Sequence, residues 1–262
     1  MKPNGPTFTD LAGVTFQLIT TCNLSCEYCF QDACNVSAAP EGEAQKIVDP
    51  RETAETVIKL LQLSNRELGV VFSGGEPLLV PIEWYETFFR IVDRYLQDSG
   101  KTVEYSIQTN ISILKPGIID LFKKHKVHFS VHYDGLLDDP KLLSKKRRDN
   151  IVTLAENGFP VTALVVGTEA SLRALPATIE FFHKYGIRFY RLNFVSSEGR
   201  GHQVSQIPSV LRAEMEFEAA FLSSQFDFRT RDNVILNKFH FYYNNVIRGH
   251  AYNTGARPQM CR

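Results

Sequence analysis

The segment that decides the fold is "VTFQLITTCNLSCEYCF", residues 14–30. Its first six residues, VTFQLI at 14–19, are an apolar and β-branched run that predicts a buried strand. Cys22, Cys26 and Cys29 follow directly, although the whole chain of 262 residues contains only five cysteines. The sequence therefore predicts three clustered thiols at the carboxyl end of the first strand.

Runs like the first one recur along the chain, with segments of helical spacing between them. Strands are expected at 14–19, 70–74, 104–109, 127–133, 161–167 and 188–195, and helices at about 51–67, 82–98, 116–125, 141–157 and 171–185. Several helices are expected to end at a glycine, as at Gly69, Gly100, Gly158 and Gly186. This α/β alternation predicts parallel strands joined by right-handed crossovers, either as a partial barrel or as an open doubly wound sheet. In both architectures ligands bind at the carboxyl ends of the strands.

The composition limits the class of function. Twenty-nine basic residues balance twenty-nine acidic ones, so no net field favours nucleic acid or an anionic membrane as a partner. The N-terminus lacks the apolar core of a signal peptide, and no stretch is long and apolar enough to span a membrane. We therefore expect a soluble cytoplasmic protein that acts on a small molecule or a peptide. In a reducing compartment, clustered cysteines more often bind metal or catalyse than form disulfides.

Several kinds of site need clustered thiols. Structural zinc takes four ligands, usually as two separated pairs, and Cys34 has no partner pair downstream. Buried cysteines without a cofactor are a second alternative. An iron–sulfur cluster with three protein thiolates is a third, and it leaves one iron with open positions for a reactant. We interpret Cys34 as a small buried thiol rather than a fourth ligand. The seven histidines show no pairing typical of metal ligands, and we expect them to be partnered or solvated.

The C-x3-C-x2-C spacing, with Tyr28 directly before Cys29, resembles the motif of the radical S-adenosylmethionine (SAM) superfamily. The resemblance implies that Cys22, Cys26 and Cys29 hold a [4Fe–4S] cluster whose open iron binds SAM, with Tyr28 near the adenine. It also implies that SAM is cleaved reductively to methionine and a 5′-deoxyadenosyl radical that abstracts hydrogen from a substrate. An electron donor such as flavodoxin or ferredoxin is an expected partner.

A second motif, "FSGGEPLL" at 72–79, follows the second predicted strand and is similar to the GGEP motif of the same family. Gly74 and Gly75 leave main-chain carbonyls open to the ammonium of SAM, Glu76 adds a charged acceptor, and Pro77 stiffens the turn. We expect these four residues to hold the methionine part of SAM. On this basis a Gly75→Val substitution should weaken SAM binding and leave the iron content near normal.

Two later strand ends add weaker similarities. "SIQTN" at 106–110 resembles the Q-T-N segment of the family, and Thr109 and Asn110 are expected to reach the sugar or carboxylate of SAM. Ile111 stands where glycine often follows. "FSVHYDG" at 129–135 is similar to the S-x-D-G strand end with one extra residue, which assigns Ser130 to SAM and Asp134 to the pocket.

The loop after this motif is shorter than in relatives, which usually carry there an arginine that pairs with the SAM carboxylate. Arg147 and Arg148 are the candidates to replace it, although a basic run is usually a solvated helix face. "NFVSSEGRG" at 193–201 resembles a loop of the subgroup that carries SPASM or twitch auxiliary clusters. The alternative is a flexible connector in which Glu198 and Arg200 are surface charges.

The resemblance covers residues 12–200 and implies a partial (β/α)6 barrel similar to a TIM barrel, followed by a C-terminal helical extension at 201–262. In this extension we expect a helix at 207–224. Cys261 alone cannot hold an auxiliary cluster, so we expect a truncated portion of a longer enzyme with a SPASM or twitch domain. The alternative is that Cys261 is a free terminal thiol.

The subgroup includes sulfatase-maturing enzymes and maturases of ribosomal peptides, so the expected substrate is a peptide or protein side chain. Two alternatives stay open. One is a radical SAM enzyme for a small metabolite, and the other is a non-enzymatic iron–sulfur or zinc protein that senses redox state or binds a partner. No residue is assigned as a general base.

Overall fold

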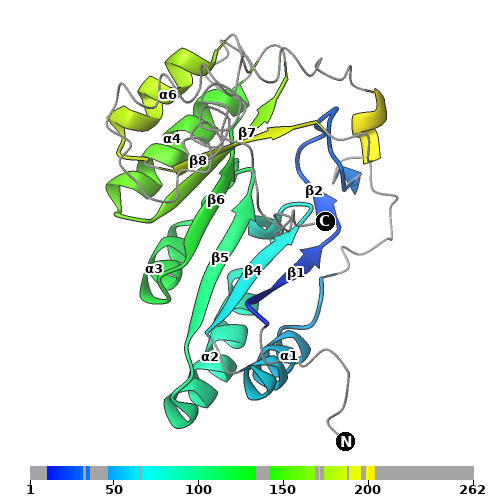
Figure 1. The fold of residues 1–262 in the computed structure, drawn as a ribbon, viewed down its shortest axis with the longest axis vertical. Helices are drawn as coiled ribbons and strands as arrows, with labels where there is room; N and C mark the ends of the chain where they lie inside the picture. Colours follow the sequence, from blue (N-terminus) through cyan, green and yellow to red (C-terminus); the bar gives the residue numbers. More distant parts are fainter. Residues whose placement is uncertain are drawn as a thin grey trace, which may run out of the picture. The chain divides into compact units, whose positions relative to one another are not determined.

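Six parallel strands form one sheet in the order β1-β4-β5-β6-β7-β8, which is also their order along the chain (Figure 1). The computed structural model describes residues 11–31, 34–35, 47–64, 67–133, 142–168, 171, 174–187, 189–195 and 199–203. The strands are β1 (Gly13–Ile19), β4 (Leu68–Gly74), β5 (Val103–Thr109), β6 (His128–His132), β7 (Val161–Gly167) and β8 (Phe189–Phe194). The six predicted strands are confirmed, each within two residues at either end.

Helices connect the strands, as the alternating pattern predicts. They are α1 (Pro50–Leu63), α2 (Ile82–Ser99), α3 (Pro116–Lys124), α4 (Leu142–Glu156) and α6 (Leu175–Lys184), and the short helices η3 (Pro77–Leu79) and η4 (Gly199–Gln203) lie at strand ends. The Asp49 side chain caps the N-terminus of α1 by accepting hydrogen bonds from the main-chain N–H groups of Arg51 and Glu52. Gly100, Gly158 and Gly186 have positive φ directly after α2 and in the turns that follow α4 and α6.

One predicted helix end is wrong. The expected helix at 51–67 ends already at Leu63, and Gly69 lies inside β4, where it pairs with Gly13 of β1. A Cβ atom on Gly13 would lie 2.9 Å from the Gly69 carbonyl oxygen. This pair of glycines therefore allows the two strand backbones to approach closely, which the helix-ending interpretation missed.

Burial alternates along the strands. On β5, Tyr105, Ile107 and Thr109 are buried, whereas Ser106 and Gln108 between them are only half-buried. On β6, Phe129 and Val131 are buried in the same alternating way. Side chains on successive strand residues point to opposite faces, so the helices cover one face of these strands. Helices on a single face are typical of a partial barrel, whereas a doubly wound sheet has them on both faces.

The covered face is filled by an aromatic cluster between the sheet and helices α2 and α3. Phe72 of β4 lies at its centre, with its ring centroid 5.2 Å from that of Phe88 and 5.5 Å from that of Tyr85. The side chains of Tyr85, Phe88, Phe89 and Phe122 are almost completely buried. Edge-to-face contacts of this kind add to the free energy that burial of the rings contributes.

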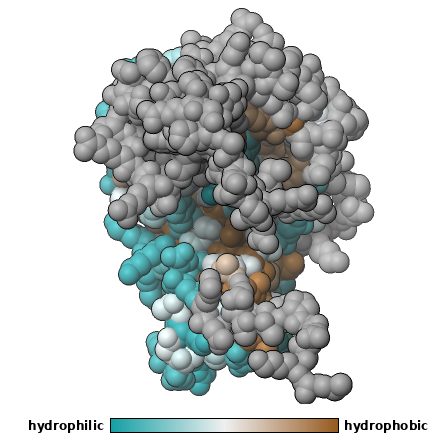
Figure 2. All heavy atoms as spheres, in the orientation of Figure 1, coloured by the Kyte–Doolittle hydropathy of each residue, from teal (hydrophilic) through white to brown (hydrophobic). Residues whose placement is uncertain are grey.

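The barrel is open on one side. Among the described strands, β1 pairs with β4 and β8 with β7, and the two edge strands do not pair with each other. Figure 2 shows apolar residues gathered in the middle of the view and hydrophilic ones around the lower left, where α2 and α3 lie in Figure 1. No helix within the described ranges is long and apolar enough to cross a membrane.

The described residues all belong to the first of two units of the chain, Met1–Ile207 and Pro208–Arg262. The predicted helix at 207–224 and Cys261 lie outside the described residues. The expected extension toward an auxiliary-cluster domain stays a prediction.

Candidate active site

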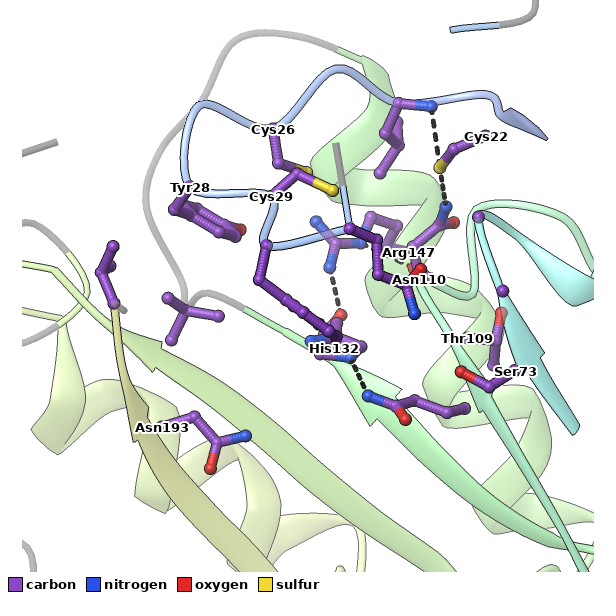
Figure 3. Close-up of a pocket in the computed structure, with 18 of the residues that line it drawn as sticks. Cys22, Cys26, Tyr28, Cys29, Ser73, Thr109, Asn110, His132, Arg147 and Asn193 are labelled. Atoms are coloured by element: carbon purple, nitrogen blue, oxygen red, sulfur yellow. Dashed lines mark hydrogen bonds between the residues drawn. The ribbon is translucent and has the colours of Figure 1, made fainter. Parts of the chain in front are cut away.

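A pocket with a volume of about 200 Å³ lies at the carboxyl ends of the strands, where both candidate architectures predict ligands (Figure 3). The predicted site residues that line it are Cys22, Cys26, Tyr28, Cys29, Gly74, Gly75, Thr109 and Asn110. Residues from more distant parts of the chain complete its wall, namely Ser73, Gln108, His132, Arg147 and Asn193. The fold therefore brings together three segments that the sequence singles out separately.

The cysteine loop begins at the end of β1. Cys22 ends the two-residue strand β2 (Thr21–Cys22), which pairs in parallel with β3 (Cys34–Asn35). The Cys22 thiol is buried, and its sulfur accepts from the main-chain N–H of Leu24 at 3.4 Å and from Asn110 Nδ2 at 3.6 Å. Burial raises the pKa of this thiol, while the two donors act in the opposite direction. Cys26 and Cys29 are half-buried and line the same pocket as Cys22 (Figure 3).

The glycine turn after β4 packs against the segment that leads into Cys22. The main-chain N–H of Gly75 donates to the Ile19 carbonyl at 2.7 Å, and that of Glu76 donates to the Thr21 carbonyl at 3.0 Å. A Cβ atom on Gly75 would lie 2.1 Å from the Thr21 oxygen, and one on Gly74, where φ is 128°, would lie 2.3 Å from the Ile19 oxygen. Both glycines are therefore required by contact with the chain itself.

Glu76 lies behind the pocket wall. Its side chain is fully buried, and its carboxylate accepts from Thr109 Oγ1 at 2.7 Å and from the main-chain N–H groups of Asn110 and Leu78 at 2.8 and 2.9 Å. Burial raises its pKa, whereas these three donors and the charge of Arg147 lower it. Pro77 is also buried. The structure thus gives Glu76 and Pro77 a supporting place between the ends of β4 and β5, rather than a place in the pocket.

Asn110 connects the end of β5 to the cysteine loop. Its Nδ2 donates to Asn23 Oδ1 at 3.0 Å as well as to the Cys22 sulfur, and its Oδ1 accepts from Ser112 Oγ at 2.6 Å. Ile111 next to it has a φ of 54°, in the left-handed region that favours glycine. This backbone conformation explains physically why glycine suits the position, and a buried β-branched residue occupies it here at a cost in strain.

Ser130 and His132 lie on the same face of β6, two residues apart. Ser130 lines a second hollow of about 1030 Å³ on the inner face of the sheet, whereas His132 lies at the strand end and lines the pocket with the cysteines. His132 Nε2 is 2.8 Å from Gln108 Nε2, within hydrogen-bond distance. His132 therefore lines the pocket, whereas Ser130, which the resemblance assigns to SAM, lines the second hollow. Gln108 and Asn193 line both hollows.

Arg147 of α4 reaches across the ends of two strands. Its Nε donates to the Asn110 carbonyl at 2.9 Å, and its Nη2 donates to the His132 carbonyl. Its guanidinium carbon lies 6.0 Å from the centre of the Tyr133 ring. Of the two predicted arginines, Arg147 thus faces the pocket, while Arg148 is not among the residues that line it. The basic run is a solvated helix face only in part. Lys145 and Lys146 are exposed, whereas Arg147 and Arg148 are half-buried.

Comparison with known proteins identifies the family. Residues 16–182, more than half of the chain, match the Radical SAM superfamily, and this match spans all the pocket segments except β8. The chain belongs to the Radical SAM superfamily. Its members use a [4Fe–4S] cluster held by three cysteines together with SAM. The match to this superfamily supports an enzymatic function.

The relatives include a sulfatase-maturating enzyme and a cyclopropyl synthase. The chain is 27% identical over 228 residues to a cysteine-type anaerobic sulfatase-maturating enzyme of Clostridium novyi. The aligned region covers 81% of this chain and 58% of that enzyme. It is 32% identical over 122 residues to the radical SAM cyclopropyl synthase TigE of Paramaledivibacter caminithermalis, which covers 44% of this chain and 25% of TigE. The chain thus spans less than two thirds of the length of these relatives.

Solved radical SAM structures have a similar fold. The structure of native anSMEcpe with bound AdoMet, another name for SAM, superposes on this chain with a TM-score of 0.63 at 18% identity. The match covers 91% of this chain and 62% of the anSMEcpe chain. Streptococcus suis SuiB bound to its precursor peptide SuiA gives a TM-score of 0.61 at 13% identity, with 83% and 47% covered. At these identities the likeness supports the partial barrel and nothing further.

The residues of the pocket fit the cofactors of the superfamily. Three thiols line one pocket, and no group of three or more His, Cys, Asp or Glu in the described part of the chain is placed to hold a single metal ion. Three cysteines hold the cluster in this superfamily, and all three thiols here line the one pocket where SAM is expected.

Several residues missed by the motifs carry a simple signal. Ser73 precedes the glycine turn, and His132 and Asn193 are polar residues at the carboxyl ends of their strands, where parallel sheets bind ligands. Asp134, Glu198 and the side chain of Cys34 lie outside the described residues, so their predicted roles stay predictions.

Proposed function

We propose that this chain carries the catalytic core of a radical SAM enzyme that modifies a side chain of a peptide or protein. The observation that supports the proposal best is the single pocket that joins the three-cysteine loop, the glycine turn and the ends of β5 and β6. The relatives with peptide and protein substrates support the substrate class.

In the proposed site, Cys22, Cys26 and Cys29 hold the [4Fe–4S] cluster. When bound, the cluster supplies the electron that cleaves SAM, and the 5′-deoxyadenosyl radical then removes a hydrogen atom from the substrate. A flavodoxin or ferredoxin is the proposed source of that electron. The protein itself provides orientation and exclusion of water, through the cysteine loop and the carboxyl ends of the strands that line the pocket.

The methionine part of SAM is assigned to the backbone of Gly74 and Gly75, with Thr109 and Asn110 as further contacts. Tyr28 on the cysteine loop lines the same pocket and is assigned to the adenine. His132 replaces Ser130 in this assignment, because its side chain lines the pocket with the cysteines. Asn193 of β8 lies on the side of the pocket that continues into the larger hollow, which we assign to the substrate.

Mass spectrometry of a candidate peptide tests the substrate class. A short peptide encoded beside the gene is co-expressed with the enzyme without oxygen, and a Cys26→Ala variant serves as control. The proposal predicts a mass change in the peptide that depends on Cys26. Turnover of a small metabolite with no change in any peptide would contradict the peptide assignment and support the metabolite alternative.

A further inference from the structure

The cysteine loop also contacts the segment that follows β8, the last strand. None of the proposed contacts with SAM or the cluster involves this segment. The helix η4 begins at Gly199, and in Figure 1 it lies beside the segment that follows β1. The main-chain N–H of Arg200 donates to the Cys29 carbonyl at 3.0 Å. Arg200 Nη1 donates to Ser25 Oγ at 2.9 Å. Arg200 of η4 thus contacts both ends of the segment 25–29, which contains Cys26 and Cys29.

Gly199 fits against this loop so closely that no side chain has room. A Cβ atom on Gly199 would lie 2.5 Å from the carbonyl oxygens of both Cys29 and Phe30, and 2.7 Å from the Phe30 carbonyl carbon. All three are main-chain atoms, which cannot turn aside as a flexible side chain can. Gly199 also has a φ of 54°, so glycine is favoured there on two separate grounds.

The contact has a consequence for the open barrel. The two edge strands β1 and β8 do not pair among the described residues, yet the loop after β1 and the helix after β8 touch at the carboxyl end. The first part of the cysteine loop is held separately, because Asn110 donates to Asn23 and to the Cys22 sulfur. Within the part that carries Cys26 and Cys29, the Cys29 N–H donates to the Cys26 carbonyl at 3.2 Å.

We propose that Gly199 and Arg200 are positioning residues that fasten the Cys26–Cys29 segment and thereby fix two of the three ligands of the cluster. This inference rests on the proposed cluster site. The same chain segment connects the cluster to the pocket wall, because Asn193, Phe194 and Val195 of β8 and its end line the pocket just before η4. The contact therefore joins the substrate side of the pocket to the cysteine loop.

Gly199→Ala tests the close approach, and Gly186→Ala is its matched control. Gly186 has a φ of 70°, so alanine is strained there as well, but a Cβ atom at Gly186 meets nothing within 4 Å. Both variants are reconstituted without oxygen, and iron content, cluster absorbance and the rate of iron loss to a chelator are measured. We expect Gly199→Ala to hold less iron and to lose it faster, and Gly186→Ala to match the wild type.

A second set of variants keeps the test independent of the folding of Gly199→Ala. Arg200→Ala and Ser25→Ala each remove the side-chain hydrogen bond, so each should speed iron loss by up to about fivefold, and the double variant should not exceed either single one. Arg200→Lys, which keeps a charged N–H donor on a flexible side chain, should show a smaller effect than Arg200→Ala. The electron paramagnetic resonance spectrum of the reduced cluster should change in Arg200→Ala while the thermal unfolding of the iron-free chain stays the same.

The outcomes separate two failures. If the wild type binds no cluster, the proposed function fails and the contact has no cluster to position. The positioning role is overturned, while the proposed function stands, if the wild type binds a cluster and neither variant differs from its reference. The rate of iron loss to the chelator and the resonance spectrum would then be the same for Gly199→Ala and Gly186→Ala, and for Arg200→Ala and the wild type.

Discussion

Gly75 has a structural role beside the SAM contact that the motif predicts for it. Its missing side chain was expected to leave room for the ammonium of SAM, and the structure shows that the chain itself also needs this room. The turn after β4 donates to the carbonyls of Ile19 and Thr21, directly before Cys22. The position of the cysteine loop therefore depends on the glycine turn.

This contact changes the expected effect of replacing Gly75. A Cβ atom would overlap the Thr21 carbonyl oxygen at 2.1 Å and its carbon at 2.4 Å, so Gly75→Ala should displace the segment before Cys22. We now expect loss of iron together with loss of SAM binding, rather than normal iron content. Iron analysis after reconstitution checks this, with Gly100→Ala as control, because a Cβ atom there meets nothing within 4 Å. Full iron with weak SAM binding would restore the original expectation.

Glu76 marks the limit of what a motif tells about a residue. The motif predicts Glu76 as a direct acceptor for SAM, whereas in the structure its carboxylate is buried behind the pocket wall and accepts from the protein itself. Its three donors come from Leu78, Thr109 and Asn110. Two of these lie more than thirty positions away in the sequence, and only the parallel pairing of β4 with β5 brings them within reach.

At the scale of elements, Arg147 links a helix to two strand ends. Arg147→Lys should weaken SAM binding, because the guanidinium donates to two carbonyls in a fixed fork that an ammonium does not reproduce. Arg147 holds the ends of β5 and β6 through these carbonyls, so loss of one hydrogen bond should loosen the pocket wall and lower the SAM affinity by up to about tenfold. Calorimetry with the reconstituted enzyme measures it, and Lys146→Ala on the exposed side of α4 is the control. Equal affinity of Arg147→Lys and wild type would remove Arg147 from the site.

The contact between α2 and α3 predicts a dependence of stability on pH. His125 stacks on Phe89 at 3.9 Å, and its Nδ1 lies 3.6 Å from Asp93 Oδ1. Burial lowers the pKa of His125 below its ordinary value of 6.5, Asp93 raises it and Lys124 lowers it. The unfolded chain therefore takes up this proton at a higher pH than the folded chain, and folding loses stability as the pH falls below 6.5.

His125→Phe preserves the ring on Phe89 and removes the titration. We expect the free energy of unfolding of the wild type to fall more than that of the variant between pH 8 and about 5.5. Chemical denaturation at both pH values measures the difference. If the wild type instead gains stability relative to His125→Phe on acidification, the attraction of Asp93 outweighs burial and the sign is reversed.

The elements were easier to predict than the site because their signals are local. Strand alternation and helical spacing are written into short stretches, and they give β5 and β6 nearly to the residue. The length of α1 was overestimated because Gly69 belongs to a strand contact with Gly13, which lies far away in the sequence. The sequence alone does not show that His132 rather than Ser130 lines the pocket, because this depends on how far β6 extends toward the cysteine loop. The contact of Arg200 with Ser25 joins positions 175 apart, so no local pattern reveals it.

At the scale of the whole molecule, the fold is a partial barrel whose six strands follow the order of the chain. This simple topology is why the strand–helix alternation alone predicts the neighbours of each strand. The pattern does not decide between barrel and open sheet, and the one-sided burial of β5 and β6 supplies that decision. The carboxyl ends then converge on one pocket, where the predicted cysteines, glycines and polar residues meet.

The most direct test of the account is the reductive cleavage of SAM. The chain is purified and reconstituted without oxygen, supplied with SAM and a strong reductant, and 5′-deoxyadenosine is measured by chromatography. The account predicts a brown protein with about four irons that forms 5′-deoxyadenosine, and a Cys26→Ala variant that loses both the colour and the product. A wild-type chain that holds a full cluster and binds SAM but forms no 5′-deoxyadenosine, or a Cys26→Ala variant with full iron and activity, would contradict it.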